Sequence, residues 1–70
     1  MDIIVLNMDD RQAEEIARIF LSQNYSVIRI EESKLVNQVW MVEILVSSFS
    51  DTMKKRVKIN NKTGSIMGCE

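Results

Sequence analysis

Apolar residues are densest in the run from Val39 to Val46, which contains the only tryptophan of the chain. Alternation with a period of two places a wholly apolar set on one side of an extended strand: Trp40, Val42, Ile44 and Val46. The other side carries a second set with one charged member: Val39, Met41, Glu43 and Leu45. A strand that is apolar on both sides is typical of the middle of a sheet. The pattern therefore predicts a central strand here.

An amphipathic helix is predicted upstream of this strand, from about Asp10 to Gln23. Its apolar residues recur at intervals of three and four: Ala13, Ile16, Ala17 and Phe20. Asp9 and Gln12 have the spacing of a capping box, and Met8 and Ala13 that of a hydrophobic staple. Asn24 suits a left-handed cap at the C-terminal end. We expect the apolar stripe to pack on the Trp40 side of the sheet.

Shorter patterns predict the other strands. The apolar run Ile3–Leu6 favours a buried strand before the helix. Tyr25–Glu32 is expected to point Ile28 and Ile30 to one face, and Tyr25, Val27 and Arg29 to the other. The polar segment Glu31–Asn37 is interpreted as the connection to the central strand, although Leu35 and Val36 could extend either strand.

The C-terminal third of the chain predicts a loop and a hairpin. Ser47–Asp51 is expected to be a loop because it contains three serines. Met53–Asn60 alternates as a half-exposed strand, Asn60–Gly64 predicts a turn in which Gly64 has a positive φ, and Ser65–Cys69 predicts a short closing strand. The expected fold is a single α+β domain over residues 1–70, one helix packed on a small, mainly antiparallel sheet in the order β-α-β-β-β-β.

The composition argues against catalysis and against a bound cofactor or metal. The chain has no histidine, which is the most common general base, and a single cysteine, Cys69. A zinc site is effectively excluded without these ligands, and the paired carboxylates lack the alternating oxygen ligands of a calcium loop. Neither glycine lies in a phosphate-binding pattern. The first residues include only four consecutive apolar positions and no basic start, so we expect no export signal, no membrane span and a cytoplasmic location.

From Asp9 onward the chain resembles a PepSY-like domain, in which a helix is followed by an antiparallel meander. The resemblance rests on the helix stripe, on Trp40–Glu43 and on the segment Val57–Ile66 with its Thr63-Gly64 turn. PepSY-like domains are usually extracytoplasmic, whereas this sequence predicts no export signal, and the strand predicted over Ile3–Leu6 is additional. The resemblance implies a non-catalytic, protein-contacting or regulatory module, and it assigns no catalytic residue.

Two surfaces are candidates for function. One helix can cover only one side of the central strand, so Val39, Met41 and Leu45 are expected to form an apolar face, joined or not by Tyr25 and Val27. Such a face favours a small protein-interaction module that forms a homodimer or binds another protein. Alternatively, the basic stripe Lys54–Lys62 predicts nucleic-acid contacts by Lys54, Arg56 and Lys58. A solvated strand face explains this stripe better, because no aromatic residue interleaves with it.

Overall fold

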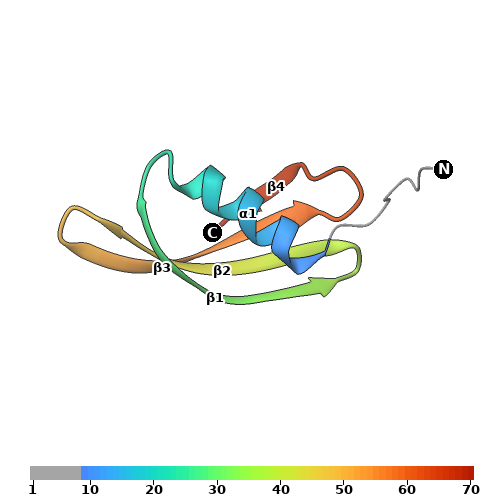
Figure 1. The fold of residues 1–70 in the computed structure, drawn as a ribbon, viewed down its shortest axis with the longest axis horizontal. Helices are drawn as coiled ribbons and strands as arrows, with labels where there is room; N and C mark the ends of the chain where they lie inside the picture. The colour runs from blue at the N-terminus through green and yellow to red at the C-terminus, as the bar shows by residue number, and fades with distance from the viewer. Residues whose placement is uncertain (1–8) are drawn as a thin grey trace.

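A single helix lies across one face of a four-stranded antiparallel sheet (Figure 1). The computed structural model describes residues 9–70. Its elements are α1 (Asp10–Leu21), β1 (Ser26–Val36), β2 (Val39–Ser48), β3 (Asp51–Asn60) and β4 (Ile66–Cys69), and the strands follow one another as a meander, β1-β2-β3-β4. The predicted class, α+β with one helix on a sheet, is confirmed. The predicted order β-α-β-β-β-β does not match the described order α-β-β-β-β. The additional strand was predicted over Ile3–Leu6, which lie outside the described residues.

The start of α1 follows the predicted capping box. The carboxylate of Asp9 accepts a hydrogen bond from the backbone N–H of Gln12 at 2.9 Å, and the Gln12 side chain accepts one from the backbone N–H of Asp9 at 3.3 Å. These two bonds satisfy N–H groups that the helix itself leaves without acceptors. The predicted staple depends on Met8, which lies outside the described residues.

The end of α1 differs from the prediction. The helix stops at Leu21, and Ser22 caps it in a right-handed conformation. The backbone N–H groups of Asn24 and Tyr25 both donate to the carbonyl of Leu21, at 3.1 and 2.9 Å. This tight turn uses the terminal carbonyl without a left-handed residue, so the predicted cap at Asn24 is wrong.

The core lies between α1 and the Trp40 side of the sheet, as predicted. Ala13, Ala17 and Leu21 of the helix are buried, together with residues of two strands: Trp40, Val42, Ile44, Val46, Val57 and Ile59. Small alanines on the helix stripe allow close approach to the sheet. Leu21, one turn after Ala17, belongs to the stripe although the sequence pattern did not include it.

The predicted faces of β1 are wrong because the strand contains bulges. Val27 is paired with Val46 and Ile30 with Ile44, with irregularities in the register between Val27 and Arg29 and between Ile30 and Glu32. An extra residue in a strand reverses the side to which all later residues point. Val27 and Ile30 therefore both pack against the core, whereas Ile28 is 48% exposed.

The first hairpin is tighter than predicted. β1 continues to Val36, which pairs with Val39, so the polar segment Glu31–Asn37 is mostly strand and not connection. Asn37 and Gln38 have φ values of 51° and 65°. Positive φ at both central residues is characteristic of a type I′ turn, whose twist matches that of paired strands.

The second hairpin is also tight. Ser48 pairs with Asp51, which leaves Phe49 and Ser50 as the turn in place of the predicted loop Ser47–Asp51. Phe49 has a φ of 56°, and its side chain is fully exposed. At the third turn Gly64 has a φ of 79°, which confirms the predicted positive φ.

One buried polar side chain, Asn61, ties two of these turns together. Its Oδ1 accepts a hydrogen bond from Nε1 of Trp40 at 2.7 Å, and its Nδ2 donates to the Gln38 side chain at 3.1 Å. The backbone N–H of Asn61 donates to the carbonyl of Gln38 at 2.9 Å. The β1–β2 turn and the β3–β4 turn are thereby held beside each other at one end of the sheet.

Candidate functional site on the open face of the sheet

Both candidate surfaces predicted from the sequence, the apolar face and the basic stripe, lie on the side of the sheet opposite α1. We call it the open face, because no other element of residues 9–70 covers it. On β2 it presents Val39, Met41, Glu43 and Leu45, all of which are half-buried. Their neighbours Trp40, Val42, Ile44 and Val46 point into the core, so the predicted alternation is confirmed.

The register between β2 and β3 places the basic residues beside these side chains. Met41 pairs with Lys58, Glu43 with Arg56, and Leu45 with Lys54. Residues that pair across antiparallel strands point to the same side of the sheet. The predicted apolar interface and the predicted basic stripe are therefore one surface and not two.

The register between β1 and β2 completes this surface on the other side. Met41 pairs with Lys34, Glu43 with Glu32, and Leu45 with Arg29. Met41 and Leu45 thus each lie between two long basic side chains, whose aliphatic parts can screen them from water. Glu43 lies between Met41 and Leu45, as the sequence alternation predicts, so the apolar side chains of this face do not form one continuous patch.

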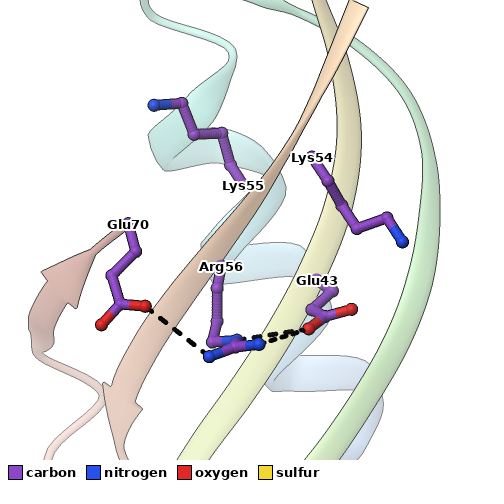
Figure 2. A pocket seen from close by; sticks show the side chains of 5 residues that line it. All are labelled: Glu43, Lys54, Lys55, Arg56 and Glu70. Atoms are coloured by element: carbon purple, nitrogen blue, oxygen red, sulfur yellow. Dashed lines mark hydrogen bonds and ion pairs between the residues drawn. The ribbon is translucent and has the colours of Figure 1, made fainter.

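An ion-pair network lies at the centre of the open face. Arg56 donates to one carboxylate oxygen of Glu43 from Nη2 at 2.8 Å and from Nε at 3.2 Å, and its Nη1 is 3.6 Å from the carboxylate of Glu70. Figure 2 shows Arg56 between the two carboxylates. Nζ of Lys58 lies 3.0 Å from the other oxygen of Glu70. This network pairs two acids with two bases.

The partner of Glu43 is Arg56 of β3 and not Arg29 of β1. Nε of Arg29 donates instead to Glu31, the residue at the second irregularity of β1, at 2.8 Å. The hydrogen bond from Arg56 holds the pKa of Glu43 below its ordinary value. The Glu43 carboxylate correspondingly raises the pKa of Arg56.

Glu70 is a member of the network that sequence reasoning missed. It follows β4, and its backbone exchanges hydrogen bonds with Arg56, N–H to O, at 2.8 and 3.0 Å. The hydrogen bond from Lys58 lowers the pKa of its side chain. No sequence motif marks this residue, because its position depends on an extra residue in β4 that shifts the register between Lys58 and Ile59.

Shallow hollows lie at this network and, separately, beside the end of α1. One is lined by residues of β2 and β3 together with Glu70: Glu43, Lys54, Lys55, Arg56 and Glu70 (Figure 2). Nζ of Lys55 lies 5.4 Å from the centre of the Tyr25 ring, a distance at which a cation and an aromatic face attract each other. A second hollow lies between the end of α1 and the β2–β3 turn, and is lined mainly by serines together with Asn24, Tyr25 and Phe49.

The open face can bind by a mixture of apolar and charged contacts. Among the aromatic residues, Trp40 is buried in the core, Phe20 and Tyr25 pack against the core, and Phe49 is at a turn. Within residues 9–70 no group of three or more His, Cys, Asp or Glu side chains is arranged to hold a metal ion, and no helix has the length and apolar character to cross a membrane. Cys69 is exposed.

Comparison of the chain with protein-family models, with curated proteins and with solved structures found no significant match.

Proposed function

We propose that this protein is a small non-enzymatic interaction module that associates with a second copy of itself through the open face. The supporting observation is that α1 covers only the Trp40 side of β2. Val39, Met41 and Leu45 remain half-buried on the other side, and no layer formed by residues 9–70 lies above them. Covering such side chains contributes roughly 25 cal/mol for each Å² of apolar surface removed from water.

The charges on the open face do not oppose this proposal. An unpaired carboxylate is expensive to bury, and Glu43 lies in the middle of the surface. Two nitrogens of Arg56 donate to Glu43, and the remaining charges of the network are balanced by Glu70 and Lys58. A second copy can therefore cover the centre of the open face without leaving Glu43 as a lone buried charge.

The resemblance to PepSY-like domains, which rests on the sequence alone, implies a similar role. It suggests a non-catalytic module that contacts proteins. A monomeric protein that binds a different protein through the open face would also fit this role.

The proposal is tested by the change Met41→Lys. Light scattering over a concentration range should show concentration-dependent self-association of the parent protein. Met41→Lys should weaken this association about tenfold or more, because it removes an apolar contact and introduces a charge. The matched control is Met67→Lys, since Met67 is 56% exposed and lies on β4, which does not pair with β2. A parent that stays monomeric at high micromolar concentration would refute self-association through this face.

Nucleic-acid binding through Lys54, Arg56 and Lys58 is the alternative, and the arrangement supports it less. Arg56 and Lys58 are already engaged by Glu43 and Glu70. These carboxylates would also repel phosphates on the same surface. Submicromolar binding to single-stranded RNA or DNA at physiological salt, abolished by changing the three basic residues to Gln, would reverse this ranking. Such binding should weaken steeply as salt is raised, whereas apolar association should not.

A further inference from the structure

The outer edge of β3 is only partly paired. β4 accompanies β3 from the middle of the strand to its end, through the pairs Val57–Cys69, Lys58–Gly68 and Ile59–Ile66 and the Arg56–Glu70 hydrogen bonds. Over Asp51–Lys55, β3 pairs with β2 alone among the described residues. In Figure 1 this part of the β2–β3 hairpin reaches beyond both α1 and β4.

The direction of the free backbone groups follows from the Arg56–Glu70 pair. Both the N–H and the C=O of Arg56 bond to Glu70, so they point away from β2. The β2–β3 register has no irregularity from Asp51 to Asn60, so this direction alternates along β3 with a period of two. The backbone groups of Thr52 and Lys54 therefore also point outward, while those of Met53 bond toward β2.

We propose that this edge pairs in an antiparallel manner with the same edge of a second copy. One two-fold register uses all the outward groups: Thr52 of one copy lies opposite Lys54 of the other, and Met53 lies opposite Met53. Centring the pair on Lys54 would set Thr52 against Arg56, whose groups are taken by Glu70. Centring it on Thr52 would set Lys54 against Ser50 in the turn.

Charge complementarity favours a second copy as the occupant of this edge. In the proposed register Asp51 of each copy lies opposite Lys55 of the other, so the contact contains two opposite-charge pairs related by symmetry. Lys54 lies opposite the uncharged Thr52. Opposite-charge cross-strand pairs stabilise a sheet, and like-charge pairs destabilise it. The competing interpretation is that Lys54 and Lys55 protect the edge from pairing, as lysines on edge strands commonly do.

Edge pairing and the proposed stacking of open faces use different residues. The edge contact continues the sheet from one copy into the next and leaves both open faces on the same side. The face contact depends on Met41 and Leu45. Either contact alone produces a dimer, and both together produce a larger assembly. The edge proposal therefore does not rest on the proposed function, and variants can separate the two.

Cysteine cross-linking tests the register directly. In a Cys69→Ser background, Met53→Cys should form a disulfide-linked dimer under mild oxidation. Directly opposite residues of a non-hydrogen-bonded pair have Cα atoms about 4.5 Å apart, within the range of about 4.4–6.8 Å that a disulfide spans. Thr52→Cys should link poorly, because its direct neighbour is Lys54. The control Met67→Cys, at an exposed position of β4, measures the rate of cross-linking by random collision. Linking of Met53→Cys no faster than of Met67→Cys would overturn the proposal.

Charge reversal provides a second measurement that does not require a cysteine. In a Met41→Lys background, which removes the face contact, Asp51→Lys and Lys55→Asp should each weaken dimerisation about tenfold, since two exposed ion pairs become repulsive. The double reversal should restore the affinity. If Met41→Lys alone is monomeric at all concentrations, the edge proposal fails and the face proposal stands. If Met41→Lys changes nothing and Met53→Cys links, the face proposal fails instead.

Discussion

The hydrogen bond between Trp40 and Asn61 offers a quantitative test of the fold. It spans 2.7 Å between two side chains that are 8% and 1% exposed, and it connects β2 to the turn after β3. Asn61→Ala should leave the indole N–H without this acceptor. An unsatisfied buried polar group costs about 1–3 kcal/mol. Loss of the bond to Gln38 and the space left by the amide add to this, so we expect a total of about 2–4 kcal/mol.

A double-mutant cycle isolates the pair. Trp40→Phe removes the donor, and in this background Asn61→Ala should cost less than in the parent protein. The difference should be about 1 kcal/mol, the net contribution of a typical buried hydrogen bond. Because Trp40 is the only tryptophan, unfolding by urea should be followed by far-ultraviolet circular dichroism and not by fluorescence. Free energies of unfolding that add within about 0.3 kcal/mol would show that the two side chains are not coupled.

Two further predictions concern the core and the ion pair. Ala17→Asp buries a carboxylate against the sheet and should cost several kcal/mol of stability, enough to unfold so small a domain. The control Ile19→Asp, on the exposed side of α1, should cost less than about 1 kcal/mol. Unfolding followed by circular dichroism compares the two variants. Because Arg56 lowers the pKa of Glu43, the stabilisation from this pair is present above the ordinary pKa of a glutamate and is lost as the pH falls through the lowered value. Glu43→Gln should therefore flatten the acid side of the stability profile measured by urea unfolding, and an unchanged profile would show that the pair contributes nothing.

Long, regular alternation made the centre of the fold predictable. The helix stripe and the two faces of β2 each repeat several times with one period, so their assignment does not depend on any single residue. β1 was not predictable in the same way. Its bulges at Ile28 and Glu31 reverse the alternation twice, and the resulting pattern resembles an irregular polar segment. The charged residues Glu32 and Lys34 then suggested a loop, although they lie on the open side of a strand.

The residues of the site could be predicted from the sequence, but the fact that the apolar and basic residues share one face could not. Which residues of β3 lie beside Met41 and Leu45 depends on the length of the β2–β3 turn. A two-residue turn at Phe49-Ser50 sets Ser48 opposite Asp51, and the pairing of Leu45 with Lys54 follows. The sequence suggested a longer loop, because serines are common in loops and a phenylalanine with positive φ is rare. With that longer loop, the register between β2 and β3 was not defined, and neither was the position of the basic residues relative to the apolar ones.

Their coincidence on one face changes what that face can bind. A polyanion would meet Lys54, but it would also meet the carboxylates of Glu43 and Glu70, which already engage Arg56 and Lys58. A protein surface that offers apolar groups and charges of both signs can contact the apolar, the acidic and the basic side chains of the open face. Along β2, Met41 and Leu45 lie beside basic residues and Glu43 lies beside an arginine. We therefore expect the open face to bind a protein rather than a nucleic acid. The neighbouring bases also explain why Met41 and Leu45 are only half-buried within one copy.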